Sequence, residues 1–476
     1  MHPVAELGQL RRSDPSRSSW VERSLRARDG GVLDDAGFRA WLADRRRAQS
    51  QQVRRVPLTS MDRWGFAHET GNLGHVSGRF FTVEGIHVTT DSGPVREWAQ
   101  PIINQPEIGI LGIAVREIDG LLHCLVQAKC EPGNVNGIQL SPTVQATRSN
   151  YTRVHGGAQV PYLSLFRDAE PSHVLADVLQ SEQGAWFYRK RNRNMVVEVG
   201  DDVEAGEDFC WLTLGQLLAL LREDDLVSMD ARTVLSCIPY GGGEHDDGAA
   251  TPFAAALQRS RSADEGGLHT TTEVLSWITG MHAGHELHAR RIPLCTVADW
   301  KRTDYEIAHV DGRYFKVVAV DVVANSREVS SWQQPLLEPV GTGVAALLVR
   351  EFHGVLHVLV NAHVEPGYLD TVELAPTVQA TPENYAHLPA EHRPRFLDLV
   401  LAPDPAKVRF DTVLSEEGGR FLHARTRYLV VEDDSAPAQA PPGFHWLTVH
   451  QLADLLQHSH YVNVQARTLF ACLLAA

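Results

Sequence analysis

Two kinds of hydrophobic pattern alternate along the chain. Short stretches rich in β-branched and aromatic residues, such as 80–88 and 314–322, predict strands. The runs 108–118 and 121–130 predict two more strands, because only Asp119-Gly120 separates them and this dipeptide favours a two-residue hairpin turn. These segments predict a sheet that contains at least one antiparallel hairpin.

Leucine-rich segments of helical spacing follow the strands. Thr213–Gln216 and Thr448–Gln451 have the Thr-x-x-Gln form of a capping box, and each precedes a leucine-rich run. A helix is also expected after Asp34 or Asp35, because apolar residues between 38 and 42 recur at i, i+3 and i+4. Helices together with hairpin-linked strands indicate the α+β fold class.

The whole pattern occurs twice. Pro142–Thr147 returns as Pro376–Thr381, a spacing of 234 positions (376 − 142). The same spacing relates Trp98 to Trp332, Val115–Glu117 to Val349–Glu351, Glu131–Gly133 to Glu365–Gly367, and Asn150-Tyr151 to Asn384-Tyr385. A repeat of this length far exceeds a solenoid unit, so it predicts two copies of one globular domain.

The copies suggest how the chain is divided. Residues 1–30 are polar and arginine-rich, and we expect a flexible arm or a loosely attached helix there. The first module is predicted at 31–240 and the second at 271–476. Residues 241–270 are rich in Gly, Asp, Ala and Ser with little apolar periodicity, which indicates a linker.

Composition excludes several classes of protein. A formal charge of −15 argues against a nucleic-acid partner, because that binding depends on neutralising phosphates. It does not exclude a small anionic ligand, which needs only a few local cations. The six cysteines form no Cys-x-x-Cys pair, and no stretch is apolar enough for a membrane span or a secretion signal. A cytoplasmic protein is therefore expected.

The strand predicted at 121–130 presents two different faces, because side chains alternate along a strand. One face is apolar. The other carries His123, Gln127, Lys129 and Glu131. The same row in the second copy reads His357, Asn361, His363 and Glu365. The row is either the solvated face of an antiparallel sheet or a polar site whose buried members need hydrogen-bond partners.

Glu131-Pro132-Gly133 should end this strand in a turn, with proline fixing φ and glycine free to adopt a positive φ. The glutamate is then either an acceptor that satisfies the turn or a general base at the mouth of a pocket.

The run 141–155 is dense in hydrogen-bonding side chains, so it is either loop scaffolding or a polar ligand site. The second copy has Pro382 in place of Arg148 and lacks clear equivalents of Arg153 and His155. We therefore favour the first copy as the one that binds and processes an anionic ligand.

No motif indicates a metal or a nucleotide cofactor. The histidines of 282–288 fit a solvated helix face better than a ligand set. Glycine-rich dinucleotide and P-loop motifs are absent from the sequence.

Several motifs resemble those of the NDP-hexose 2,3-dehydratase family of deoxysugar biosynthesis, which serves antibiotic glycosides. They are Trp98–Pro101, Gly109–Glu117, Lys129–Asn134 and above all Leu140–Tyr151. The resemblance covers about 38–474, including the duplication. It implies two fused Nudix-like modules assembled as a homodimer. The glutamate box of Nudix hydrolases is missing, which fits a fold reused for other chemistry.

The resemblance also implies a substrate, an NDP-4-keto-6-deoxyhexose that usually carries a thymidine nucleotide. The ketone at C4 acidifies the C3 proton, a base removes it, and the C2 hydroxyl leaves with the help of an acid. The product is a 3,4-diketo-2,6-dideoxy sugar nucleotide, which an NADPH-dependent 3-ketoreductase would consume. This reaction needs no redox cofactor of its own.

We assign roles on this basis. Glu131 or His155 would be the base, and Lys129 or Tyr151 the acid or enolate stabiliser. Orienting groups would be His123 and Gln145. The residues expected to hold the diphosphate and the nucleotide base are Arg148, Arg153 and Trp98, and the remaining substrate contacts would come from Thr143, Asn150 and Gln127.

Two other functions stay open at this point. One is a protein that binds a nucleotide sugar without reacting. The other is a Nudix-type pyrophosphatase, which the missing glutamate box disfavours.

Overall fold

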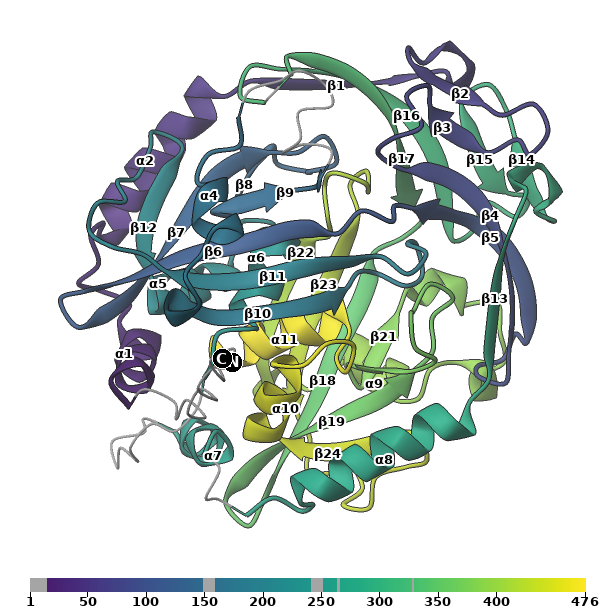
Figure 1. Ribbon diagram of the computed structural model, residues 1–476. Coiled ribbons are helices and arrows are strands. Elements are labelled where there is room, and N and C mark those ends of the chain that lie inside the picture. Colours follow the sequence, from purple (N-terminus) through teal and green to yellow (C-terminus); the bar gives the residue numbers. More distant parts are fainter. Residues whose placement is uncertain (1–14, 149–158, 241–250, 263–265, 328) are drawn as a thin grey trace, which may run out of the picture.

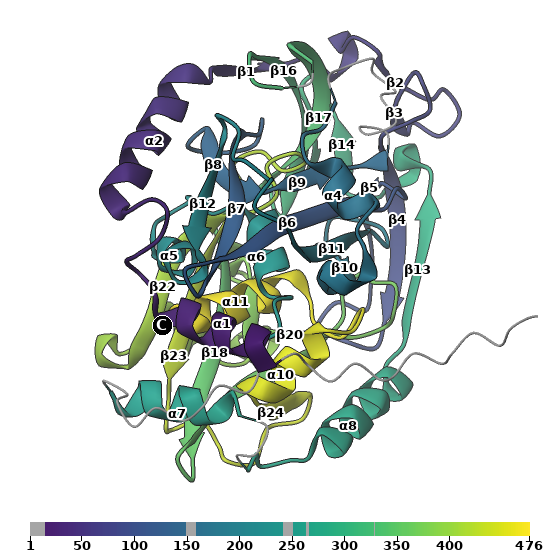
Figure 2. The same ribbon diagram turned by 60° about the vertical axis from the view of Figure 1, so that its left-hand side comes forward.

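The computed structural model describes residues 15–148, 159–240, 251–262, 266–327 and 329–476. It confirms an α+β protein made of two similar halves. Helices α6 (Met229–Leu235) and α11 (Val464–Leu474) lie near the centre, between the main sheets of the two halves (Figure 1). Helices α2 (Asp35–Ala48) and α8 (Thr271–Gly284) lie on the outside (Figure 2).

Each half contains a mixed main sheet. The first has the order β10-β11-β6-β7-β12, with β8 beside β7 and β9 beside β6. Its strands are β6 (Gly109–Ile118), β7 (Leu121–Cys130), β8 (Ile138–Pro142), β9 (Val144–Ala146), β10 (Val174–Ser181), β11 (Arg191–Glu198) and β12 (Phe209–Thr213). Strands β6 and β11 are parallel and the other neighbours are antiparallel.

The second main sheet repeats this plan. Its order is β20-β19-β18-β23-β22, with β21 beside β18 and β24 beside β19. Its strands are β18 (Gly343–Phe352), β19 (Val355–His363), β20 (Glu373–Ala375), β21 (Val378–Ala380), β22 (Val408–Ser415), β23 (Arg425–Glu432) and β24 (Phe444–Thr448).

The hairpin predicted in the first half is confirmed. Asp119 and Gly120 both have a positive φ (51° and 80°) between the antiparallel strands β6 and β7.

Two smaller sheets mix strands from both halves. Strand β1 (Gln51–Val56) of the first half pairs with β16 (Phe315–Ala324) of the second. Strand β13 (Leu287–Ile292) of the second half pairs in return with β4 (Thr82–Thr90) of the first. The other strands of these sheets are β2 (Trp64–Phe66), β3 (Leu73–His75), β5 (Glu97–Asn104), β14 (Trp300–Arg302), β15 (Glu306–His309) and β17 (Ser331–Pro339). The halves are therefore interlocked and not simply placed in tandem.

The remaining helices surround the sheets. They are α1 (Pro15–Arg26), α4 (Leu163–Arg167), α5 (Leu214–Ala219), α7 (Pro252–Ser260), α9 (Leu397–Leu401) and α10 (Val449–Leu456). Single 3₁₀ turns occupy Leu58–Ser60, Pro171–His173, Leu220–Arg222, Leu294–Thr296, Pro382–Asn384, Ala390–His392 and Pro405–Lys407. Within the described ranges, none of the helices has the length and apolar character that crossing a bilayer requires.

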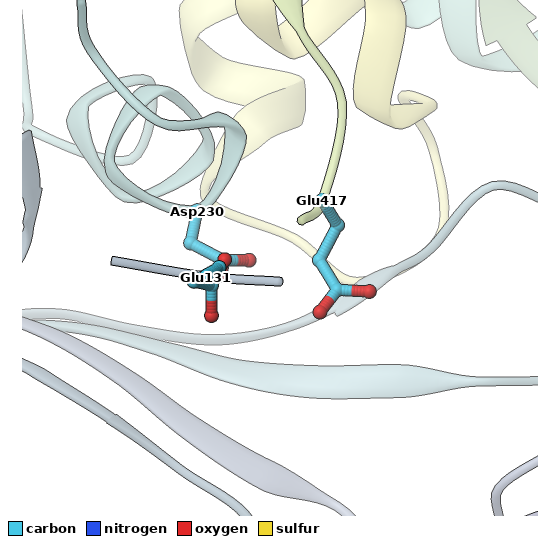
Figure 3. A group of neighbouring side chains, drawn as sticks. All are labelled: Glu131, Asp230 and Glu417. Atoms are coloured by element: carbon cyan, nitrogen blue, oxygen red, sulfur yellow. The ribbon is translucent and has the colours of Figure 1, made fainter. Parts of the chain in front are cut away.

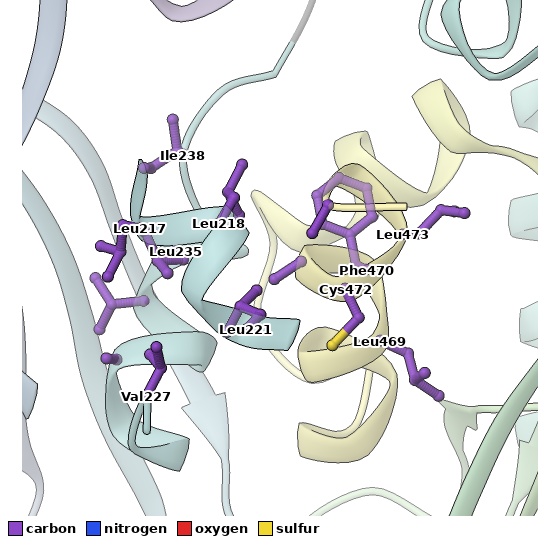
Figure 4. Close-up of a cluster of buried hydrophobic side chains, with 14 of the residues drawn as sticks. Leu217, Leu218, Leu221, Val227, Leu235, Ile238, Leu469, Phe470, Cys472 and Leu473 are labelled. Atoms are coloured by element: carbon purple, nitrogen blue, oxygen red, sulfur yellow. The ribbon is translucent and has the colours of Figure 1, made fainter. Parts of the chain in front are cut away.

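One hydrophobic core joins the halves. Both predicted capping boxes form, with Thr213 accepting from the Gln216 amide at 3.0 Å and Thr448 from the Gln451 amide at 3.1 Å. The leucines after the first box lie beside α11, and they belong to one buried cluster with its Leu469, Phe470 and Leu473 (Figure 4). Burial of apolar side chains between the helices that end the first half and α11, which ends the second, therefore holds the halves together.

Two segments differ from the predicted arm and linker. Residues 15–26 form α1, whose Val21 is 2% exposed and packs into the common core. Residues 252–260 of the predicted linker form α7, whose Ser260 hydroxyl donates to the Leu356 carbonyl of β19. The helix expected as one alternative for the arm therefore forms, although it is packed and not loosely attached. Helix α7 is short and made mostly of small or polar residues, so its periodicity is too weak to predict it.

The glycine of each Glu-Pro-Gly turn was predicted to adopt a positive φ, but neither Gly133 nor Gly367 does. Each is needed for a close approach of two backbones instead. A Cβ built on Gly133 would lie 1.7 Å from the Phe421 carbonyl oxygen of the other half. Gly133 also donates to the Gly418 carbonyl at 2.7 Å. The relation is reciprocal, because a Cβ on Gly367 would lie 1.7 Å from the Phe187 oxygen. Glycine is required because two backbones touch there.

Candidate functional site

A cavity of about 420 Å³ lies where the first main sheet meets segments of the second half. The first half contributes polar side chains at the ends of β7 and β9, near the start of β11 and at the start of α6: Lys129, Glu131, Gln145, Lys190, Asn192 and Asp230. The second half contributes Arg327, Trp332, Gln334, Glu417 and Arg420. Both halves therefore build this one cavity.

Three carboxylates meet in this cavity. Glu131 follows the end of β7, Asp230 lies in the first turn of α6, and Glu417 follows β22 in the second half. Each contributes an oxygen within 4.8 Å of the others (Figure 3). We call Glu131, Asp230 and Glu417 the carboxylate triad.

Two members of the triad, Asp230 and Glu417, have raised pKa values. Burial raises the pKa of Asp230 well above its usual value, and the charges of Glu417 and Glu131 raise it further. Burial also raises the pKa of Glu417 to about 8, with Arg420 opposing the shift and Glu131 adding to it. Carboxylates this close cannot all be ionised. At neutral pH the triad therefore contains at least one carboxylic acid.

Glu131 is held by donors. The Gln145 amide donates to its Oε1 at 2.9 Å, and the Lys129 ammonium lies 3.9 Å from the same atom. Lys129 in turn donates to Gln145 Oε1 at 2.7 Å. Among the described residues, Glu131 is therefore the triad member that has both a hydrogen-bond donor and an ammonium group beside the same oxygen.

Further cations lie around the triad. Burial lowers the pKa of Lys190 to about 8, with Glu182 opposing the shift. Arg420 lies 4.3 Å from the centre of the Phe81 ring and donates to Gln105 at 3.0 Å. Arg327 donates to the Cys130 carbonyl at 3.0 Å. A cavity with this set of cations can accept an anionic ligand despite the net charge of the chain.

One wall of the cavity is aromatic. Trp64, Phe80 and Phe81 of the first half line it, and so does Trp332 of β17. The Trp64 and Phe81 ring centres are 4.9 Å apart. Trp332 donates from its indole nitrogen to Gln334 at 2.9 Å, which fixes the ring plane. This wall offers flat apolar surfaces to a nucleobase.

Three sequence-predicted residues line the cavity together, namely Lys129, Glu131 and Gln145. His123 shares their strand face but lies six residues, or roughly 20 Å, from Lys129. It is 1% exposed, its Nδ1 lies 3.0 Å from the Leu121 carbonyl oxygen, and burial lowers the pKa of its imidazole. It is therefore a core residue at the far end of the strand.

The other predicted contacts lie elsewhere. Thr143 bridges two strands by donating to the Leu125 carbonyl and accepting from the Ala114 amide. Trp98 donates to Gln100 on β5, outside the cavity lining, which contains its counterpart Trp332 instead. Gln127 and the exposed Arg148 do not line the cavity either. Four candidates lie outside the described residues: Asn150, Tyr151, Arg153 and His155.

Sequence reasoning missed Asp230, Glu417, Lys190 and Arg420. A signal for them existed, because their counterparts in the other copy are uncharged: Gln465, Gln183, Ala424 and Trp186. Comparing charged positions over the whole repeat, rather than around residues 141–155 alone, would have found them.

The corresponding place in the second half has different chemistry. Glu365 accepts from Gln379 at 2.8 Å and from the Ala185 amide at 3.1 Å. Asn463 donates to Gln379 and to the Tyr368 hydroxyl, and Tyr368 is 3% exposed. Amides, a phenol and the His363 imidazole, whose Nε2 lies 3.6 Å from Glu365 Oε1, therefore surround Glu365 where the first half has the triad.

The triad has the spacing of a metal site, and carboxylate oxygens suit Mg²⁺ or Ca²⁺. The Lys129 ammonium already lies beside Glu131. The positive charge of Arg420 acts on Glu417 and opposes the rise of its pKa. Protons and side-chain cations can thus balance the triad's charge without a metal ion.

Comparisons with known proteins agree on one family. A family model described as NDP-hexose 2,3-dehydratase matches residues 35–238 and 271–473. A protein of Amycolatopsis orientalis named dTDP-4-dehydro-6-deoxy-alpha-D-glucopyranose 2,3-dehydratase is 53% identical over 461 residues, covering 96% of this chain and 93% of that protein. Proteins of the same name from Saccharopolyspora spinosa and Streptomyces violaceoruber are 51% and 47% identical, covering 95% and 93% of this chain and 94% and 97% of their own lengths.

Proposed function

The chain belongs to the NDP-hexose 2,3-dehydratase family, and we propose that it removes water across C2 and C3 of dTDP-4-keto-6-deoxyglucose by acid–base elimination. The observation that supports this mechanism best is the carboxylate triad. It places Glu417, whose pKa burial raises to about 8, within 4.8 Å of Glu131, which Gln145 and Lys129 hold, and the elimination needs an acid and a base.

In this proposal Glu131 acts as the base, one of the two residues expected from the sequence; the other, His155, lies outside the described residues. Its carboxylate takes the C3 proton, which the C4 ketone makes acidic, and the electron pair moves into a C3–C4 enediolate. Gln145 and Lys129 orient Glu131. Removing a general base typically costs about 10²- to 10⁴-fold in rate.

Glu417 acts as the acid, with Asp230 as its proton-sharing neighbour. As the C2–O bond breaks, the acid protonates the departing hydroxyl and water leaves. The resulting C2–C3 enol then takes up a proton at C2 and becomes the 3,4-diketo-2,6-dideoxy sugar. The reaction changes no oxidation state overall, so a redox cofactor is not needed.

Two ammonium groups are available for the charge that develops on the C4 oxygen, Lys129 and Lys190. Donors aimed at such an oxyanion contribute about 10²- to 10³-fold. Arg327 and Arg420 take the diphosphate in place of the predicted Arg148 and Arg153, and the aromatic wall takes the thymine.

The family resemblance supports further proposals. We propose that each half is a Nudix-like module, that the enzyme is a cytoplasmic homodimer, and that it acts in antibiotic biosynthesis ahead of an NADPH-dependent 3-ketoreductase. Light scattering of the purified protein tests the dimer.

The reaction itself is tested with purified protein and dTDP-4-keto-6-deoxyglucose. NMR should show loss of the C3 proton and of the C2 hydroxyl, with the same rate in EDTA. Glu131→Gln and Lys129→Met should be slow. Binding of the intact sugar nucleotide without turnover would favour a binding protein, and magnesium-dependent release of a nucleoside monophosphate would favour a pyrophosphatase.

Trp332 and Trp98 form a matched pair for locating the nucleotide. Each donates from its indole to a glutamine two residues later at 2.9 Å, but only Trp332 lines the cavity. Base–aromatic stacking is worth about 1–3 kcal/mol. We expect Trp332→Ala to raise KM about tenfold or more and Trp98→Ala to leave it unchanged, measured by steady-state kinetics. Equal effects would place the thymine elsewhere.

The pH dependence follows from Glu417. Because its pKa is raised to about 8, it carries a proton at pH 7 and loses it above pH 8. An acid must be protonated to act, so kcat should fall as pH rises through about 8. Lys190 titrates near the same pH, so Lys190→Arg serves as the control. The fall of kcat above pH 8, the alkaline limb of the pH profile, should persist in Lys190→Arg. If this fall disappears, it belongs to the titration of Lys190.

A further inference from the structure

Arg232 is buried at 0% exposure and lies on α6, two residues after Asp230. Its guanidinium donates to the Val227 carbonyl at 2.6 Å, the Ser415 carbonyl at 2.8 Å and the Thr468 hydroxyl at 3.3 Å. One side chain thus spans α6, the end of β22 and α11.

The contact with Ser415 bears on the triad. Ser415 is the last residue of β22, and Glu417 follows two residues later. Arg232 therefore ties the segment that carries Asp230 to the segment that carries Glu417. Since these segments come from different halves, this contact helps set the distance between the two carboxyl groups.

The charge of Arg232 has no direct counter-ion. Among the described residues, no carboxylate oxygen forms an ion pair with its guanidinium; its ring neighbour is Tyr428, at 5.5 Å, which donates to Glu416 at 2.8 Å. A buried cation without a paired carboxylate costs several kcal/mol. The fork geometry, which reaches three acceptors at once, gives the guanidinium a role that an apolar side chain cannot fill.

The second half contains a natural control. Arg467 on α11 donates to the Val462 carbonyl at 2.7 Å, the Ser181 carbonyl at 2.5 Å and the Thr233 hydroxyl at 2.6 Å. These contacts mirror those of Arg232. The positions that correspond to Asp230 and Glu417 are here Gln465 and Gln183. Arg467 reaches α6 through Thr233 but does not contact the segment that carries Glu417, so it does not join Asp230 to Glu417.

We propose that Arg232 is a positioning residue for the elimination, which fixes the separation of Asp230 and Glu417 and so the sharing of their proton. This inference rests on the proposed function of the triad. Arg467 makes the same kinds of contact at the end of β10, the strand that leads to Gln183 instead of Glu417.

The test compares Arg232→Lys with Arg467→Lys in the full-length enzyme. Lysine keeps the charge but cannot reach three acceptors. The melting temperatures of both variants should be lowered by similar amounts. Only Arg232→Lys should lose kcat, by about 10- to 100-fold, since small misplacements of reacting groups cost that much. Its KM should stay near the wild-type value, and its alkaline limb should shift.

Three results would speak against the inference: an unchanged pH profile in Arg232→Lys, an unchanged kcat, or equal kcat losses in both variants. If lysine prevents folding, Thr468→Val and Thr233→Val remove one contact from each arginine and carry the same expectations. The wild-type rate in the same assay separates the two claims. A wild type that eliminates no water contradicts the proposed function, whereas an active wild type with indistinguishable variants contradicts only the role of Arg232.

Discussion

Asp230→Asn is expected to lower kcat by about 10²- to 10⁴-fold and at the same time to stabilise the fold at alkaline pH. The loss of rate follows because an amide cannot exchange a proton with Glu417, and acid–base groups contribute factors of this size. Steady-state kinetics with the 4-keto sugar nucleotide measures it.

The gain in stability follows from proton linkage. The folded protein raises the pKa of Asp230 above its unfolded value, so the folded state binds the proton more tightly. The contribution of this group to stability is therefore full below the unfolded pKa and is lost as pH rises through the folded pKa. Asparagine has no such loss. The melting temperature of Asp230→Asn should exceed that of the wild type at pH 8 and approach it in acid.

Glu365→Gln is the matched control, because Glu365 is the counterpart of Glu131 in the second half and is 7% exposed. It should cost stability, since its oxygens accept two hydrogen bonds, but leave kcat nearly unchanged. A wild-type rate for Asp230→Asn, or an equal loss for Glu365→Gln, would contradict the assignment of the site to the first half.

Gly133→Ala should destabilise the protein by more than about 3 kcal/mol, at the upper end of overpacking effects. The added methyl group would lie 1.7 Å from the Phe421 oxygen and 2.7 Å from the Gly418 oxygen. Both are backbone atoms, so neither can rotate away. The change also pushes apart the turn that carries Glu131 and the loop that carries Glu417. Denaturant unfolding and the yield of soluble protein measure the effect.

Two other glycines serve as controls for Gly133→Ala, one expected to be mild and one expected to be equally severe. Gly137 has a φ of 78° with no atom near its would-be Cβ, so Gly137→Ala should cost only about 1 kcal/mol through backbone strain. Gly367→Ala repeats the clash of Gly133 on the other side and should be comparably damaging. If Gly133→Ala were as mild as Gly137→Ala, the two backbones would not be in close contact.

Local features of the fold could be predicted from sequence. The hairpin at Asp119-Gly120, the two capping boxes and the strands near 80–88 and 314–322 follow from the preferences of a few neighbouring residues. The exchange of β1 and β13 could not be predicted in this way. Periodicity determines which residues form a strand, whereas its partner depends on the whole fold.

The same limit applies to the site. Alternation along β7 correctly grouped Lys129 with Glu131 but gave no information on which end of the strand meets a cavity, so His123 was included. Trp332 lines the cavity and its counterpart Trp98 does not. The sheet that contains β17 and Trp332 also contains β1 of the first half, and no pattern around Trp98 indicates that exchange. Glu417 reaches the triad from the other half, and no pattern within the first copy could indicate it.

The exchange of β1 and β13 has a consequence for the origin of this enzyme. A single-copy ancestor with the same fold would leave one edge of its small sheet bare, so it would need a second molecule to lend a strand. Such a pair would carry two identical clefts, and a mutation would alter both at once. Two copies within one chain are free of that constraint: one cleft can carry acids and lysines while the other carries amides and a tyrosine.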